Sequence, residues 1–262
     1  MASAVKITII TPTYNRPDLL IRAIKSARSQ TFQDWEMIIV DDSTIQEAIQ
    51  KNTEIVQVDT RIKYIKNPHN MGAAHCRNLA LDDAAGEWVT LLDDDDVFYE
   101  SASLDTMHSE SISDTDSTWH TFMCVKPDGE AITRQLVDKD SYNWIKDFLY
   151  GKSFRGDATH LIKRDLIADI RNYGSQRSEW QFWYNLAEKS NFIYHPIPIV
   201  VREYLEGGLT DIWQGKRDRV FLLQQLFHAA RTIRTWKYIP LIGMRYLASF
   251  NVVSKVYISL KT

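Results

Sequence analysis

The chain has 262 residues and a formal net charge of −3, from 31 Lys and Arg against 34 Asp and Glu, and 44% of its residues are hydrophobic. These values are typical of a globular protein with a large core, and a charge so close to neutral argues against a protein that binds nucleic acid over its whole surface. The two cysteines are too few for a disulfide framework and lack the spacing of a zinc site, which favours free thiols in a reducing compartment.

Strands and helices alternate along the first hundred residues. Apolar runs of strand length predict strands at residues 5–10, 36–40, 62–65 and 87–92. Apolar residues at helical spacing predict helices at residues 18–30 and 73–82. This alternation predicts an α/β fold with a mostly parallel sheet and helices on both faces.

After residue 100 the pattern is mixed. Residues 101–117 are polar and predict a helix or a loop, and residues 118–125 predict a strand, followed by a turn at residues 127–129 and a short strand. Further helices are predicted at residues 142–150 and 177–188, and one or two strands at residues 192–204.

Two segments bear on targeting and membrane insertion. The N-terminus has no long apolar region followed by a cleavage site, so we expect no secretion signal. The longest apolar stretch, residues 239–260, is interrupted by Arg245, Asn251 and Lys255, so we do not expect it to span a membrane.

Acidic groups follow two of the predicted strands. Ligands of such sheets bind beyond the carboxyl ends of the strands. Residues 93–96 are four consecutive aspartates, whose mutual repulsion a bound cation would relieve. Asp93 and Asp95 have the D-x-D spacing, and in an extended segment they would face one ligand while Asp94 points elsewhere. We therefore expect Mg²⁺ or Mn²⁺ here, with a solvated acidic loop as the alternative.

Three other residues are expected at the same edge. Asp41 and Asp42 end the second predicted strand and either cap a turn or accept the imide N–H of a uracil or thymine ring. Arg77 lies in the helix predicted at residues 73–82, where it either balances a diphosphate or belongs to the helix surface.

Four segments, in order and spacing, resemble the family 2 glycosyltransferases with the GT-A fold, which is Rossmann-like. They are TPTYNRP (residues 11–17), QTFQDWEMIIVDDST (residues 30–44), NMGAAHCRNLAL (residues 70–81) and AAGEWVTLLDDDD (residues 84–96). The resemblance covers residues 5–100 and implies an inverting transfer of a sugar from a nucleotide-diphosphate donor, with a divalent cation bound through the D-x-D motif.

The resemblance also implies roles for single residues at the donor site. The donor-binding residues are Pro12, Tyr14 and Asn15 in the base and ribose pocket, Asp42 at the uracil ring with Asp41 supporting its turn, Arg77 at the donor, and Asp93 and Asp94 at the sugar or ribose. Asp95 is the candidate metal ligand.

A looser resemblance in the second half concerns the general base. SEWQFWYNLA (residues 178–187) resembles the stretch E-D-Y-D-x-W-L-R-L-A, whose Asp is the family's base on the acceptor hydroxyl. Glu179 takes the place of that Asp when Trp183 is aligned, whereas a slip of one residue would place Trp180 there. A glutamate carboxylate can do this work. The alternative is a Glu that starts a helix and is favoured by its dipole.

The main prediction is therefore a single-sugar transferase, and two other functions stay open. A non-catalytic nucleotide-sugar-binding module is supported by the departure at Ser178 and Glu179. A nucleotidyl- or phosphotransferase would also use an aspartate cluster, but the P-loop pattern that would favour it does not occur. The missing Q-x-x-R-W motif argues against a processive synthase. By analogy with the family we expect a glycan or lipid-linked acceptor.

The charge is distributed unevenly. Residues 215–262 contain nine Lys and Arg against one Asp, a charge of +8, which leaves −11 on residues 1–214. We expect a nucleotide-sugar-binding half (residues 1–100), an acceptor-binding half of the same domain (residues 101–214) and a basic amphipathic helical tail (residues 215–262). The tail is predicted either to lie on anionic lipid, as interfacial helices do, or to pack on the catalytic domain. We expect a cytoplasmic protein, in the first case held at the inner face of the cell membrane.

Overall fold

A computed structural model of the protein describes residues 5–149, 153–171 and 179–204. The chain divides into two compact units, Met1–Glu203 and Tyr204–Thr262. Apart from Tyr204, the described residues all belong to the first unit. The predicted tail, residues 215–262, lies outside the described residues, and the division of the chain at residues 100 and 214 stays a prediction.

The elements follow one another largely as the hydrophobic patterns predict. The strands are β1 (Ile7–Thr13), β2 (Trp35–Asp41), β3 (Ile62–Lys66), β4 (Trp88–Leu91), β5 (Val97–Phe98), β6 (Trp119–Val125), β7 (Arg134–Gln135), β8 (Phe154–Arg155), β9 (Ala158–Lys163) and β10 (Ile193–Val201). The α-helices are α1 (Pro17–Arg28), α2 (Gln46–Val56), α3 (Ala73–Asp83), α4 (Ser103–Ser113) and α5 (Glu179–Lys189). A π-helix, Trp144–Leu149, occupies the helix predicted at residues 142–150, and a 3₁₀ helix covers Arg164–Ile167.

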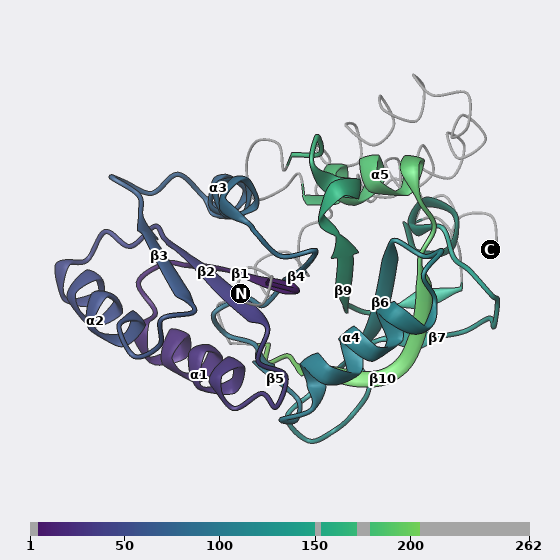
Figure 1. The fold of residues 1–262 in the computed structure, drawn as a ribbon, viewed down its shortest axis with the longest axis horizontal. Coiled ribbons are helices and arrows are strands. Elements are labelled where there is room, and N and C mark those ends of the chain that lie inside the picture. The colour runs from purple at the N-terminus through teal and green to yellow at the C-terminus, as the bar shows by residue number, and fades with distance from the viewer. Residues whose placement is uncertain (1–4, 150–152, 172–178, 205–262) are drawn as a thin grey trace, which may run out of the picture. The chain divides into compact units, whose positions relative to one another are not determined.

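Eight strands form one sheet in the order β3-β2-β1-β4-β9-β6-β10-β5. The pairs β3-β2, β2-β1, β1-β4 and β6-β10 are parallel, whereas β9 runs antiparallel to both β4 and β6 and β5 runs antiparallel to β10. Helices α1 and α2 lie on one side of the β1–β3 region and α3 on the other (Figure 1). The predicted α/β fold with a mostly parallel sheet is confirmed.

The core sits between this sheet and its helices. Every residue of β2 is buried, as expected for a strand covered on both faces, and α1 buries one stripe, Leu20, Ala23, Ile24 and Ala27. Cys76 and Cys124 are both buried free thiols, as their number predicted. No helix within the described ranges is long and apolar enough to cross a lipid bilayer.

Strand β9 is the longest strand that the sequence did not predict. It joins the parallel half of the sheet, at β4, to the second half, at β6. Its sequence ATHLIK alternates buried and partly exposed residues over only part of its length, and its partners are far away in the chain. Local periodicity is therefore a weak signal for this strand, although it lies at the centre of the sheet.

A buried carboxylate, Asp41, ties the end of β2 to its surroundings. It accepts hydrogen bonds from the backbone N–H of Ser43 at 2.6 Å, the side-chain amide of Asn52 at 2.9 Å and the hydroxyl of Tyr64 at 2.6 Å. These donors come from the following loop, α2 and β3. The bonds fix the loop after β2, which is the turn-supporting role expected for Asp41.

We expect Asp41→Ala to lower the free energy of unfolding by about 3 kcal/mol, because it leaves three buried donors without an acceptor. Urea denaturation measures the change. Asp34→Ala is the matched control, since Asp34 is an exposed residue just before β2, and it should cost less than about 0.5 kcal/mol. A loss of stability no larger than that of the control would contradict the structural role of Asp41.

Candidate active site

The four aspartates after β4 form a turn and not an extended segment. The backbone N–H of Leu92 still donates to Ile10 of β1, at 3.0 Å, and the N–H of Asp96 then donates back to the carbonyl of Asp93, at 3.0 Å. Alternation of side chains holds only for extended backbone. The extended backbone on which the expectation for Asp93 and Asp95 was based is therefore wrong, and the two side chains pair with different arginines; a ligand shared by Asp93 and Asp95 stays a prediction.

Three arginines neutralise this acidic turn. Arg77 of α3 donates to Asp93 at 2.9 Å. Arg16, in the loop after β1, donates through Nε to Asp94 at 3.2 Å and through Nη1 to Asp95 at 2.9 Å, and its Nη2 also contacts Asp94. The third arginine follows β10.

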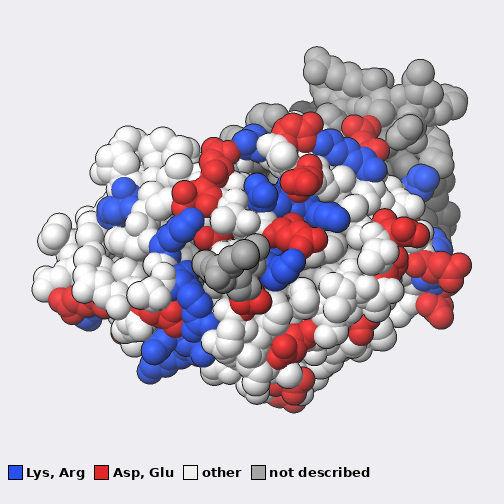
Figure 2. Space-filling view, viewed as in Figure 1, with Lys and Arg blue, Asp and Glu red and all other residues white. Residues whose placement is uncertain are grey.

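Arg202, one residue after β10, donates to Asp96 through Nε at 3.0 Å and through Nη2 at 2.8 Å. Asp96 is 2% exposed, and burial raises the pKa of its carboxyl to about 7, with Arg202 opposing the shift. Arg202 therefore compensates a charge that would be costly to bury alone. Across the middle of the face in Figure 2, acidic and basic side chains lie side by side and not in separate patches.

Asp94 is, with Asp96, one of two acids of the turn whose pKa is raised. Its side chain is fully buried and accepts a hydrogen bond from the hydroxyl of Thr13 at 2.7 Å. Burial raises the pKa of Asp94 to about 7, and the charges of Asp95 and Asp93 add to the shift while Arg16 and Thr13 oppose it. An additional cation at this turn would stabilise the ionised form.

Asp95 is the residue of this turn that was predicted to bind a metal ion. No group of three or more His, Cys, Asp or Glu that could hold a metal ion occurs within the described ranges. Mg²⁺ and ions like it need no such cage, because they are commonly held by one or two carboxylates together with phosphate oxygens and water. The side chain of Asp95 is 25% exposed and that of Asp93 is 36% exposed, so two carboxylates of the turn are accessible beside the buried charge of Asp94.

Asp42 holds the loop that leads into α3. Its carboxylate accepts hydrogen bonds from the amide of Asn67 at 2.6 Å and from the backbone N–H groups of Gly72 at 2.6 Å and Met71 at 3.1 Å. Burial alone would raise the pKa of Asp42, but these hydrogen bonds outweigh it and keep that pKa below its usual range. Gly72 has a φ of 88°, which an L side chain rarely adopts. Asp42 thereby positions the helix that carries Arg77.

The residues expected in the base pocket lie on two adjacent loops. Asn15, with a φ of 54°, accepts hydrogen bonds from the backbone N–H groups of Thr44 at 2.9 Å and Ile45 at 3.0 Å. Tyr14 is 43% exposed on the same loop, and Pro12 lies beside Val40 in the pairing of β1 with β2. The structure therefore brings the loops after β1 and β2 together.

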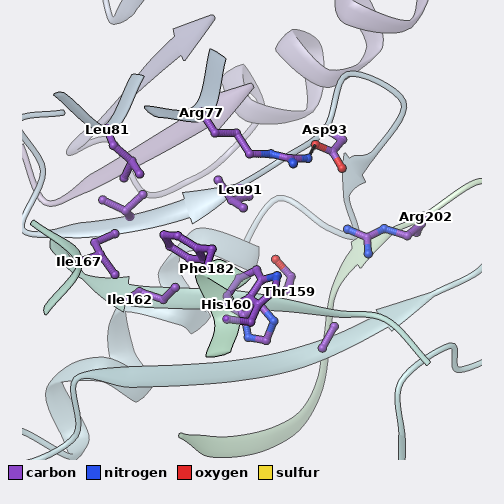
Figure 3. Close-up of a pocket in the computed structure, with 13 residues that line it drawn as sticks. Arg77, Leu81, Leu91, Asp93, Thr159, His160, Ile162, Ile167, Phe182 and Arg202 are labelled. Atoms are coloured by element: carbon purple, nitrogen blue, oxygen red, sulfur yellow. Dashed lines mark hydrogen bonds and ion pairs between the residues drawn. The ribbon is translucent and has the colours of Figure 1, made fainter. Parts of the chain in front are cut away.

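A cavity of about 110 Å³ opens beside the acidic turn. Arg77 and Asp93 meet at its edge, and Arg202 extends toward it (Figure 3). Its apolar lining includes Leu81, Ile162, Ile167 and Phe182, and its other lining residues include Thr159, His160 and Trp183. The alternative that Arg77 belongs to the helix surface is excluded, because Arg77 is 7% exposed and lines this cavity.

The predicted base, Glu179, is the first residue of α5. Trp183, which lines the cavity, follows it by four residues, and residues four apart share one face of a helix. The backbone position of Glu179 is therefore one turn from the cavity. Its side chain and that of Trp180 lie outside what the structure describes, so the role of Glu179 stays a prediction.

The sequence did not assign the roles of Arg16, Arg202 and Thr13. Arg16 lies in the segment TYNRP. The signal in the sequence that could have indicated its role was a basic residue close to the polar end of a predicted strand. Arg202 has no predicted role in the site, and the structure pairs it with Asp96. No local pattern shows that residues 16, 77 and 202 meet the same four-residue turn.

Comparison with known proteins identifies the family. A model described as "Glycosyl transferase family 2" matches residues 8–170. The GalNAc(5)-diNAcBac-PP-undecaprenol beta-1,3-glucosyltransferase of Campylobacter jejuni is 32% identical over 224 residues, which cover 83% of this chain and 71% of that protein. The chain belongs to glycosyl transferase family 2.

Solved structures agree with this family at the level of the fold. TarS 1-349 of S. aureus in complex with UDP-GlcNAc superposes with a TM-score of 0.69 at 17% identity, over 94% of this chain and 72% of that one. The mannosyltransferase PcManGT from Pyrobaculum calidifontis, in complex with GDP-Man and Mn²⁺, gives a TM-score of 0.61 at 18% identity, over 92% and 69%. The family 2 glycosyltransferase and its GT-A fold, both expected from the sequence, are confirmed.

Proposed function

We propose that this glycosyltransferase moves a single sugar, with inversion at the anomeric carbon, from a UDP-sugar to a hydroxyl of a glycan or lipid-linked acceptor. The observation that carries the proposal is the neutralised acidic turn at the end of β4, which adjoins a cavity one turn from Glu179. Acidic and cationic groups at one sheet edge suit a nucleotide diphosphate with a cation.

The donor would lie across the carboxyl ends of β1, β2 and β4. Tyr14 offers an exposed ring and Asn15 a fixed loop for the base and ribose, and Asp42, one residue after β2, would accept the imide N–H of uracil. Arg77 and Asp93, already paired, would contact the diphosphate and the sugar.

In the proposed reaction Glu179 removes the proton from the acceptor hydroxyl as its oxygen attacks the anomeric carbon. The bond between that carbon and the diphosphate oxygen breaks, and UDP leaves with the electron pair. Arg77 and Arg202 would bind the diphosphate of the donor. A Mn²⁺ or Mg²⁺ ion held by Asp95 would supply further neutralisation of the leaving group.

The proposed acceptor rests on the relative from Campylobacter jejuni. That glucosyltransferase is named for an undecaprenol-linked oligosaccharide, and this chain covers 71% of it. A non-catalytic nucleotide-sugar-binding module and a nucleotidyl- or phosphotransferase remain the rival functions. Sugar transfer by the purified protein discriminates against both.

We expect Glu179→Gln to lower kcat for sugar transfer by about 10²–10⁴-fold, because an amide cannot take the proton of the acceptor hydroxyl. Affinity for UDP, measured by calorimetry, should stay unchanged. Glu188→Gln is the matched control, since Glu188 is exposed at the far end of α5. Near-wild-type transfer by Glu179→Gln would remove Glu179 as the base.

We expect Asp95→Asn to weaken the affinity for UDP in the presence of Mn²⁺ by at least about tenfold, with a much smaller change when EDTA is present. Calorimetric titration with Mn²⁺ and with EDTA measures how much of the affinity for UDP depends on the metal. Asp116→Asn, at an exposed aspartate away from the site, should change neither value. Equal effects of Asp95→Asn with and without Mn²⁺ would argue against Asp95 as the metal ligand.

The basic tail is proposed to hold the enzyme at an anionic lipid surface, near a lipid-linked acceptor. Replacing Lys216, Arg217 and Arg219 by Gln in the full chain should reduce sedimentation with vesicles of phosphatidylglycerol and phosphatidylcholine, at low salt, because each nearby basic residue contributes about 1 kcal/mol. Sedimentation with pure phosphatidylcholine vesicles is the control. Equal sedimentation of the variant and the wild type would favour a tail that packs on the protein.

A further inference from the structure

His160 is a residue of β9 that lines the cavity and for which no role was predicted from the sequence. It lies opposite Thr121 of the neighbouring strand β6 and remains partly exposed where it borders the cavity (Figure 3). The adjoining residue, Thr159, also lines the cavity, and Arg77 and Asp93 border the same space. His160 therefore borders the same cavity as the acidic turn.

The hydrogen bonds of His160 determine which ring nitrogen carries the proton. The indole Nε1–H of Trp119 donates to Nδ1 of His160 at 3.2 Å, and an indole nitrogen can only donate. The hydroxyl of Thr121 lies 2.9 Å from the same Nδ1. Nδ1 is consequently an acceptor without a hydrogen.

The imidazole is also held neutral. Burial and, to a smaller extent, the charge of Arg202 together lower the pKa of His160 to about 3. A neutral imidazole with a bare Nδ1 must carry its proton on Nε2. Within the described part of the chain, Nε2 has no hydrogen-bond acceptor among the contacts of His160.

Aromatic packing fixes the ring and places it beside α5. The centroid of the His160 ring lies 5.7 Å from that of Trp119 and 4.4 Å from that of Trp183. Trp183 follows Glu179 by one helical turn. A ligand that contacts His160 would therefore lie between the acidic turn and the start of α5, where the proposed function requires the reacting sugar to lie.

We propose that the Nε2–H of His160 donates a hydrogen bond to a hydroxyl oxygen of a carbohydrate in this cavity and so orients that sugar for transfer. The contacts of Nδ1 with Trp119 and Thr121 leave the proton on Nε2. The rings of Trp119 and Trp183 pack against the imidazole and fix its orientation. The sugar belongs either to the donor or to the acceptor. The inference rests on the proposed transferase function.

The test compares His160→Phe, which keeps a flat ring but removes the donor, with His160→Gln, which restores an N–H. The full-length enzyme is assayed for UDP release from UDP-GlcNAc and UDP-glucose, with and without p-nitrophenyl N-acetylgalactosaminide as acceptor. His160→Phe should lower kcat/KM by about tenfold, the loss of one substrate hydrogen bond, equally at every pH from 6 to 9. His160→Gln should recover most of this loss, and His75→Ala, at an exposed residue of α3, should behave as wild type.

The assays with and without acceptor distinguish a hydrogen bond to the donor sugar from one to the acceptor sugar. A loss that already occurs in hydrolysis without acceptor assigns the hydroxyl to the donor sugar, and a loss confined to transfer assigns it to the acceptor. Active wild type with equally active His160→Phe overturns the role of His160 and leaves the proposed function intact. No UDP release by wild type from either sugar nucleotide overturns the proposed function, and this inference with it.

A second measurement determines the protonation of the His160 ring in the wild-type protein. Nitrogen-15 NMR of histidine-labelled wild type, with His160 assigned by comparison with His160→Gln, should show a protonated Nε2 and a bare Nδ1 at pH 7. A protonated Nδ1 or a charged imidazolium would overturn the inference, because Nε2–H would then not be the fixed donor.

Discussion

Repulsion among four aspartates in one turn is the constraint on which this site depends. Adjacent carboxylates in a partly buried turn are costly unless cations approach them. The cations come from three distant parts of the chain, namely Arg16 after β1, Arg77 on α3 and Arg202 after β10. The turn is therefore stable only once strands β1, β4 and β10 have joined the same sheet, so that the acidic site and the fold require each other.

The three arginines are not equivalent in exposure, and the difference has a functional consequence. The side chain of Arg77 is 9% exposed and that of Arg202 is 20% exposed, whereas Arg16 is 41% exposed. Arg16 pairs with two carboxylates of the turn, Asp94 and Asp95, whereas Arg202 pairs with Asp96 and lies 3.7 Å from Asp157, which is outside the turn. At Asp94 and Asp95 one arginine faces two carboxylates of the turn, so more negative charge remains there, which suits the metal ion that Asp95 is proposed to hold.

The sequence predicted much of this account because much of it is local. Apolar runs found the four strands of the first half, and their acidic ends located the site. The alternation of side chains expected from Asp93 to Asp95 was wrong because it presumes extended backbone, and the backbone turns between Asp93 and Asp96. Strand β9 and His160 were missed for another reason: their partners in β4 and β6 are distant in the chain, so no periodicity within β9 reveals them. Arg202 shares this difficulty, since its partner Asp96 is 106 residues away.

Release of UDP from sugar nucleotides by the purified full-length chain tests the central claim most directly. A panel of UDP-sugars is incubated with the protein and Mn²⁺ before any acceptor is known, and free UDP is quantified. The account predicts release from at least one UDP-sugar, loss of that release with EDTA and its return with excess Mn²⁺. A folded protein that releases no UDP from any member of the panel, or releases it equally with EDTA, would contradict the account.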